Sequence, residues 1–201
     1  IKNDVFNDVD ALILSRLSYF PFDDIVSADI NDKITIKNAS KKFFATDLNN
    51  DKILWNGDAD LLKACADSER FKNMKLSGYV NIVEREKQMQ FSAVVIEITE
   101  NCRYISYRGT DNTLVGWQED FNMYYMFPLP SQLTALKYLE QAAKSLNGSF
   151  ILGGHSKGGN LAVYASIFCN PEIRKRIDGV YNHDGPGFDK EVIEHNSYKF
   201  M

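Results

Sequence analysis

The stretch Phe150-Ile151-Leu152-Gly153-Gly154-His155-Ser156-Lys157-Gly158-Gly159-Asn160 decides the fold of this chain. It has the pattern of a short buried strand that ends in glycines, and an apolar helix pattern follows at once in residues 161–165. Gly154, Ser156 and Gly158 form G-x-S-x-G between that strand and that helix. A turn this tight strains its central residue and leaves no room for a Cβ two residues to either side. The stretch is therefore typical of a nucleophile elbow, which would lift the Ser156 hydroxyl above a sheet.

Two other interpretations of these glycines must be weighed. A Gly-rich turn that only packs a strand against a helix would have a similar composition. A P-loop needs G-K-[ST] after four spacer residues, whereas Lys157 precedes the glycine pair here. The sequence thus excludes a P-loop and leaves a packing turn as the alternative to the elbow.

Length and composition indicate one α/β domain over residues 1–201. Hydrophobic residues make up 44% and charged residues 25%, and the net charge of −4 gives no reason to expect a nucleic-acid partner. The three cysteines are scattered, which favours a reducing compartment and argues against a disulfide framework or a zinc site. The apolar runs are too short to span a bilayer, and no signal peptide is visible. We therefore expect a cytoplasmic protein without stable membrane insertion, metal or cofactor.

The pattern along the chain predicts an α/β fold with helices on both faces of its sheet. Residues 76–86, 89–99 and 102–108 are rich in Val, Ile, Tyr and Phe, and tight polar breaks separate them, as in an antiparallel meander. A helix over residues 131–146, with Ser131 as its N-cap, then precedes the elbow, and a further strand over 179–183 follows it. Such alternation implies parallel strands joined by crossover helices.

A second motif accompanies the elbow. The third meander strand ends in Tyr107-Arg108-Gly109-Thr110, and Trp117 to Asp120 gives W-x-x-D. With Gly154-His155-Ser156-Lys157-Gly158-Gly159, these segments resemble the F-R-G-[ST], W-x-x-D and G-H-S-x-G-G motifs of class 3 (fungal-type) lipases. The longer string through Ala165 is closer still to a bacterial family of uncharacterised lipase-like proteins. The resemblance covers about residues 76–188 and implies an α/β-hydrolase-like sheet.

The resemblance also implies roles for individual residues. Ser156 would be the nucleophile, and the amides of Thr110 and Lys157 would form the oxyanion hole, with the Thr110 hydroxyl as a further donor. Arg108 and Asp120 would hold that loop, unless they are only a surface ion pair. Lys157 replaces the usual apolar residue, and we expect its side chain to place a cation beside the site, where it could lower the pKa of neighbouring groups.

The general base is missing from the expected order of Ser, Asp and His. Only His183 and His195 follow the nucleophile, so we expect the catalytic histidine to lie beyond Met201, in a domain truncated at its C-terminus and, since Ile1 is not methionine, also incomplete at its N-terminus. His155 would point away and pack. Asp184 is the acid that we expect within the chain, although the loop around it could instead only shape a pocket.

Aromatic and methionine side chains crowd residues 121–130. They suit the wall of an acyl-chain site or a lid, and ordinary core is the other interpretation. The sequence as a whole predicts a serine hydrolase that acts on a small-molecule or lipid ester, and a catalytically inactive binding module with the same fold is the alternative. It indicates neither the acyl length nor an oligomeric state.

Overall fold

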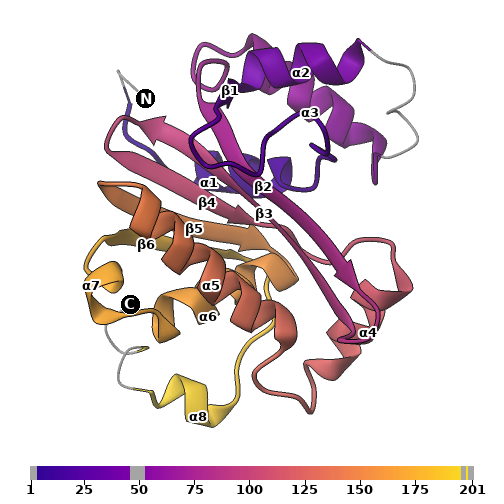
Figure 1. Ribbon diagram of the computed structural model, residues 1–201, viewed down its shortest axis with the longest axis vertical. Helices are drawn as coiled ribbons and strands as arrows, with labels where there is room; N and C mark the ends of the chain where they lie inside the picture. Colours follow the sequence, from indigo (N-terminus) through magenta and orange to yellow (C-terminus); the bar gives the residue numbers. More distant parts are fainter. Residues whose placement is uncertain (1–3, 46–52, 196–197, 199–201) are drawn as a thin grey trace.

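The centre of the molecule is a six-stranded mixed sheet in a computed structural model that describes residues 4–45, 53–195 and 198 (Figure 1). The strands are β1 (Ile34–Thr35), β2 (Lys75–Glu84), β3 (Met89–Thr99), β4 (Cys102–Tyr107), β5 (Ser149–His155) and β6 (Ile177–His183). They lie side by side in the order in which they occur in the chain. β1 to β4 pair antiparallel, and β4, β5 and β6 pair parallel. This confirms the predicted meander that leads into parallel strands.

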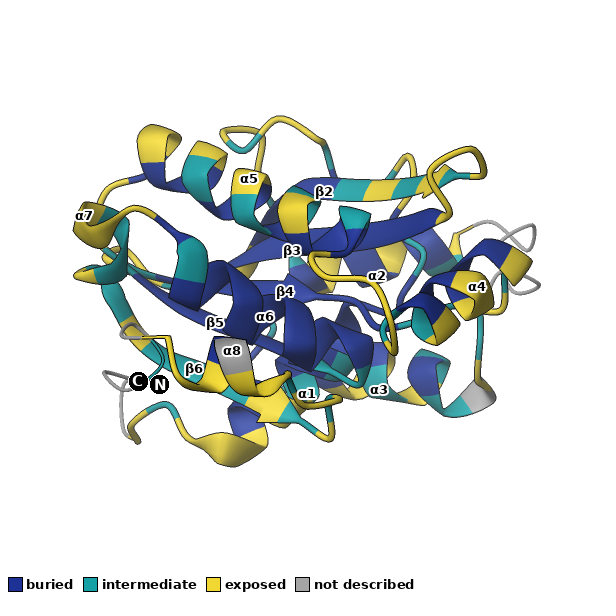
Figure 2. Cartoon of the chain, turned by 90° about the horizontal axis from the view of Figure 1, so that it is seen from below, coloured by how far each residue is buried: buried dark blue, intermediate teal, exposed yellow. Residues whose placement is uncertain are grey.

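Helices cover both faces of the sheet, as predicted. The helices are α1 (Asp8–Leu17), α2 (Ile36–Phe44), α3 (Asn56–Asp67), α4 (Leu114–Asn122), α5 (Pro130–Ser145), α6 (Lys157–Phe168), α7 (Pro171–Arg174) and α8 (Lys190–Ile193). α1, α2 and α3 pack on one face with side chains such as Tyr104 and Ile151, whereas α5 and α6 pack on the other with Tyr107 and Leu152. Successive side chains of a strand point to opposite faces, so β4 and β5 supply both cores. Figure 2 shows how completely the central strands are buried.

Local sequence explains where some helices begin. Asn7 caps α1 by accepting from the amides of Val9 and Asp10, and the Asp10 carboxylate accepts in return from the Asn7 amide. The predicted cap of α5 is wrong. Leu129 is the N-cap, Pro130 occupies the first turn, and Ser131 lies within the helix.

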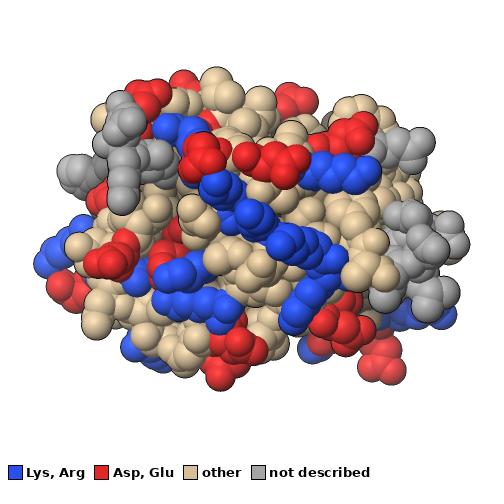
Figure 3. Space-filling model, turned by 90° about the horizontal axis from the view of Figure 1, so that it is seen from above, with Lys and Arg blue, Asp and Glu red and all other residues tan. Residues whose placement is uncertain are grey.

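Charged side chains of both signs share the surface. On the face shown in Figure 3, Lys and Arg form a diagonal band, and Asp and Glu lie along its sides. Some oppositely charged side chains pair directly: the Glu97 carboxylate binds Lys33 at 2.6 Å and Lys75 at 2.9 Å. No helix among the described residues is both long enough and apolar enough to cross a bilayer.

Candidate active site

Ser156 occupies the sharp turn between β5 and α6. Its backbone angles are φ 56° and ψ −131°, a conformation that residues with a Cβ rarely adopt. Such a conformation costs on the order of 1–3 kcal/mol and persists only where the surroundings enforce it. The Ser156 amide donates to the His183 carbonyl oxygen at 2.9 Å, so the end of β6 helps to hold the turn. Ser156 is half-buried at the amino end of α6.

The glycines of the motif are required by close backbone packing. A Cβ on Gly154 would lie 2.3 Å from the carbonyl carbon of Gly158, and a Cβ on Gly158 would lie 2.1 Å from the Tyr107 carbonyl oxygen. Real Cβ atoms essentially never lie within 3.0 Å of an atom to which they are not bonded. The predicted reason for both glycines, a turn without room for side chains, is therefore confirmed.

The loop after β4 lies directly against the elbow. A Cβ on Gly109 would come within 2.7 Å of the His155 carbonyl oxygen. The Thr110 hydroxyl donates to the Asp120 carboxylate at 2.6 Å, so its single proton is already engaged and the expectation of a hydroxyl donor to an oxyanion needs correction. Burial raises the pKa of Asp120, and the hydrogen bond from Thr110 and the charge of Lys157 oppose that rise.

Arg108 anchors the base of the same loop. Its guanidinium donates to the Asn81 side-chain oxygen at 3.0 Å and to the Asp111 carboxylate at 3.1 Å. Arg108 is buried, so it is not part of a surface ion pair, and its carboxylate partner is Asp111 and not Asp120. Arg108 and Asp120 thus hold the loop from two different sides.

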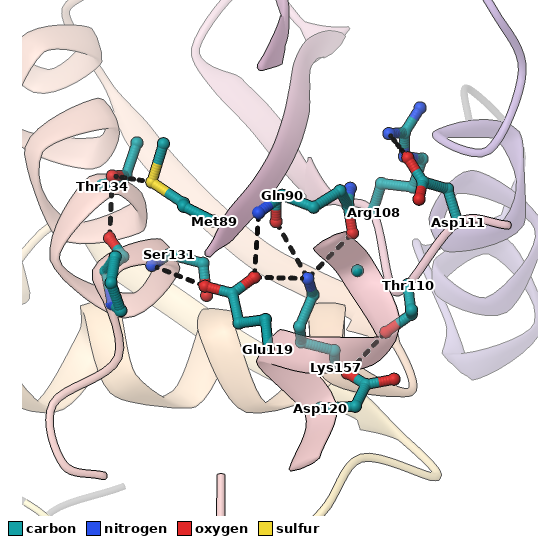
Figure 4. Close-up of polar contacts among 12 residues, drawn as sticks. Met89, Gln90, Arg108, Thr110, Asp111, Glu119, Asp120, Ser131, Thr134 and Lys157 are labelled. Atoms are coloured by element: carbon teal, nitrogen blue, oxygen red, sulfur yellow. Dashed lines mark hydrogen bonds and ion pairs between the residues drawn. The ribbon is translucent and has the colours of Figure 1, made fainter. Parts of the chain in front are cut away.

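Lys157 lines the cavity next to Ser156, and its charge acts to lower the pKa of Asp120, as expected, but its cationic group is buried. Its ammonium group is buried in the interior, where it donates to the Gln90 carbonyl oxygen, the Gln90 side-chain oxygen and the Glu119 carboxylate, each at 2.8 Å (Figure 4). Both charged side chains are almost completely inaccessible, at 1% and 0% exposure. With all three of its N–H groups engaged, Lys157 is not placed to act as a base for Ser156.

A cavity of about 470 Å³ opens at Ser156. The residues that line it are Asp120, Met123, Tyr124, Met126, Phe127, Leu129, Gln132, Ser156, Lys157, Asn160, Pro186, Gly187, Phe188 and Asp189. One side is apolar and comes from the predicted segment 121–130. Tyr124 and Tyr125 of that segment are 94% and 76% exposed, so its interpretation as ordinary core is wrong.

Three polar residues of this cavity were not identified from the sequence. Asn160 accepts from the Gln132 side-chain amide at 2.8 Å and donates to the Pro186 carbonyl oxygen at 3.0 Å, and Asp189 adds a carboxylate. Asn160 follows the elbow motif by one residue, and that adjacency was the only signal in the sequence. Nothing in the local patterns around Gln132 and Asp189 points to a cavity.

Comparison with known proteins places the chain in a family. The profile of the Mbeg1-like family matches residues 65–201, which is more than half of the chain and contains every residue of the cavity. The chain belongs to the Mbeg1-like family. No curated protein matches its sequence significantly.

Among solved structures, this Mbeg1-like chain is similar to one described as the crystal structure of M37 lipase. The two share 13% sequence identity with a TM-score of 0.49, and the match covers 95% of this chain and 64% of the lipase chain. The Mbeg1-like chain therefore spans less than two thirds of that lipase's length.

None of the three histidines of this Mbeg1-like chain, all within the described residues, lines the cavity. The Nδ1 atom of His155 lies 3.1 Å from the Tyr19 hydroxyl on the α1 face, as expected of a packing histidine. The His183 ring stacks on Tyr181, and burial, reinforced by the charge of His155, lowers its pKa. His195 packs against Phe168 at the opposite end of α6 from Ser156.

Asp184 directly follows β6 but lies outside the residues that line the cavity. It is exposed and has a positive φ of 55°. Its neighbour Gly185 lies against the elbow, because a Cβ there would come within 2.8 Å of the Ser156 carbonyl oxygen. Of the predicted site residues, Ser156 and Lys157 line the cavity, whereas Thr110 and Asp184 do not. Thr110 is connected to the cavity through its hydrogen bond to Asp120, which is a lining residue. Within the described part of the chain, His, Cys, Asp and Glu side chains form no group suited to a metal ion.

Proposed function

We propose that this chain is a serine hydrolase of the lipase and esterase type, which cleaves a carboxylic ester through an acyl-Ser156 intermediate. The observation that carries the proposal is the setting of Ser156, which combines a strained strand-to-helix turn with a place in the wall of a 470 Å³ cavity. A turn that served only for packing would gain nothing from this strain. The apolar wall of the cavity suits the acyl part of the ester, which could be lipidic.

In this mechanism the Ser156 hydroxyl attacks the ester carbonyl while a general base removes its proton. The amides of Thr110 and Lys157 stabilise the oxyanion of the tetrahedral intermediate, and loss of one such donor typically costs about 2.7–4 kcal/mol. The close approach of the Gly109 backbone to His155 supports this role for the loop. The intermediate collapses to the acyl-serine, the alcohol leaves with the proton, and water then releases the acid.

We further propose that the base is a histidine outside residues 1–201. The position of His155 and His183 on the α1 side and of His195 beside Phe168 supports this assignment. Asp184, at the carboxyl end of β6, remains the proposed acid, since active-site residues of parallel sheets collect at that edge.

Labelling with a fluorophosphonate tests the proposal on the full-length protein. We expect the probe to modify Ser156, as mapped by mass spectrometry, and Ser156→Ala to lose both the label and esterase turnover. Ser166→Ala, a buried serine within α6, is the matched control and should keep the label. Equal labelling of Ser156→Ala and wild type would exclude Ser156 as the nucleophile.

The alternative function is a binding module without catalysis, and the absence of the three histidines from the cavity favours it. A full-length protein that binds a non-hydrolysable ester analogue in the cavity, yet neither reacts with the probe nor turns over any ester, would support this alternative.

A further inference from the structure

The ion pair between Lys157 and Glu119 is unusual because it is completely buried (Figure 4). Taking two charges out of water is costly, and the attraction between them offsets this cost only when the remaining hydrogen-bonding groups are also satisfied. The two charged groups themselves are satisfied here, although Gln90 Nε2 and Ser131 Oγ beside them are buried without a hydrogen-bond partner among the described residues. All three ammonium hydrogens have acceptors, and Glu119 accepts from Lys157, from the Gln90 amide at 3.1 Å and from the Ser131 amide at 3.1 Å.

This network joins four elements around the elbow. Lys157 is the first residue of α6, Gln90 lies at the start of β3, Glu119 belongs to α4, and Ser131 lies in the first turn of α5. Each contact is to a backbone amide, a carbonyl or a charged group with a fixed direction. The carboxylate of Glu119 therefore connects α4 to the amino end of α6 as well as to β3 and α5.

The neighbouring residue of α4 contacts Thr110, whose amide is the other donor of the proposed oxyanion hole. Asp120 accepts from the Thr110 hydroxyl at 2.6 Å. Consecutive helical residues point in directions about 100° apart. Glu119 and Asp120 can therefore reach Lys157 and Thr110 from one rigid helix.

We propose that Glu119 is a positioning residue of the active site, which acts with the side chain of Lys157 to set the distance between the two oxyanion-hole amides. We call α4 with these two carboxylates the brace. The Glu119 carboxylate contacts the elbow through Lys157, and the Asp120 carboxylate contacts the loop through Thr110. A buried apolar pair of similar size would give a similar free energy of unfolding, but it would make no directional hydrogen bonds between α4 and α6. A charged pair at this position therefore serves to orient the two helices. This inference rests on the proposed hydrolase function.

The double variant Lys157→Met with Glu119→Gln, made in the full-length enzyme, separates an effect on the placement of the oxyanion-hole amides from an effect on the free energy of unfolding. Either single substitution leaves an unpaired buried charge and should lower the midpoint of urea unfolding. The double variant removes both charges and should recover part of that loss, while the remainder persists because the introduced side-chain NH2 group faces the amide N–H of Gln90 or Ser131. Its kcat for ester hydrolysis should nevertheless stay roughly tenfold to a thousandfold below wild type, with KM little changed.

A matched control is the ion pair of Arg70 with Asp10, in which Asp10 is buried at the start of α1, away from the cavity. Arg70 is 22% exposed, so Arg70→Met with Asp10→Asn should change stability in the same direction but by less, and should leave kcat unchanged. Glu119→Asp is a second test, because it keeps both charges and shortens the brace by one methylene. It should also lower kcat and leave KM unchanged.

Hydrogen exchange supplies a readout that does not depend on catalysis. In the stable double variant, amides of residues 109–113 should exchange faster than in wild type, whereas those of β3 and β4 should not. Unchanged exchange of this loop, or a kcat that recovers together with stability, would overturn the positioning role. If residues 109–113 exchange faster in the double variant but wild type shows no reaction at Ser156, the positioning role of Glu119 is supported and the hydrolase proposal is excluded.

Discussion

Ser156 holds a backbone conformation that its own side chain disfavours, and the strain comes from the Cβ and not from the hydroxyl. Replacement by alanine keeps the Cβ and so keeps the strain. Replacement by glycine removes it, because glycine adopts positive φ without steric cost.

We therefore expect Ser156→Gly to unfold with a free energy about 1–2 kcal/mol higher than Ser156→Ala. Urea denaturation of both variants, monitored by circular dichroism, measures the difference. Wild type and Ser156→Ala should be nearly equal. A glycine variant no more stable than the alanine variant would show that the turn is relaxed in solution.

His183 predicts a pH dependence of stability. Burial lowers its pKa below the ordinary value of 6.5, the charge of His155 acts in the same direction, and that of Asp8 opposes it. The unfolded chain therefore binds more protons than the folded protein between the lowered pKa and pH 6.5. The contribution of neutral His183 to the free energy of unfolding is complete above pH 6.5 and is lost as the pH falls through that window.

His183→Phe keeps a ring to stack on Tyr181 and removes the titrating group. We expect the free energy of unfolding of this variant to fall less steeply than that of wild type as the pH drops from 7 towards 5. Urea titrations at a series of pH values give the two slopes. Identical slopes would mean that His183 accepts its proton without cost, despite a buried Nε2 that has no hydrogen-bond partner.

At the scale of single residues, the sequence predicted the elbow correctly because its glycines obey a local steric rule. It did not predict the direction of the Lys157 side chain, which depends on Gln90 and Glu119, residues distant in sequence. The role of Glu119 was missed for the same reason, since W-x-x-D draws attention only to its neighbour Asp120.

Among the structural elements, the segment between α4 and α5 supplies the apolar wall of the cavity. Phe127 packs edge-on against Tyr164, with ring centroids 5.8 Å apart, and also contacts Phe168. Its side chain is thereby held at the cavity although it is 46% exposed. A wall fixed to α6 in this way is suited to recognise acyl length.

Phe127→Ala should lower kcat/KM for a long-chain ester by roughly tenfold or more and change the value for an acetyl ester much less. Assays of p-nitrophenyl esters with increasing acyl length measure this selectivity. Leu133→Ala provides a control, because Leu133 is also about half exposed but does not line the cavity. A uniform loss for all acyl lengths would assign Phe127 to folding and not to the substrate.

The boundaries of most strands were predicted within two residues, because runs of β-branched and aromatic residues separated by polar breaks are typical of strands in a sheet. β2 and β4 end slightly earlier than expected, and β3 matches the predicted 89–99. The start of α5 was misplaced since Pro130 is favoured in a first turn, where its missing N–H costs nothing. The sequence did not predict β1, and it could not predict the cavity, which depends on three-dimensional packing.

For the molecule as a whole, the charge around the cavity differs from that of the mixed surface in Figure 3. Asp120 and Asp189 line the cavity. Lys157 is the only cation among the described residues that line it, and its ammonium group lies in the interior. An ester with a negatively charged leaving group would meet no compensating charge from the described residues that line the cavity. We therefore expect uncharged or cationic esters to be preferred.

Asp189→Asn should improve kcat/KM for an anionic ester by about 1.5- to 5-fold, as an exposed charge contributes about 0.2–1 kcal/mol. The value for a neutral ester should stay the same, and added salt should reduce the difference. Asp178→Asn, an exposed aspartate of β6 outside the cavity, is the control. Equal improvement by both variants would indicate an effect of net charge alone.

The unbroken strand order of the sheet has a consequence for synthesis on the ribosome. Each strand pairs with the strand that precedes it in the chain, so a nascent chain can add β2 to β5 one after another without waiting for a distant partner. The elbow is different, because the Ser156 amide bonds the carbonyl of His183 and the Ser156 carbonyl lies against Gly185. These two contacts of Ser156 can therefore form only after β6 has emerged from the exit tunnel, which makes this turn one of the last parts of the sheet to mature.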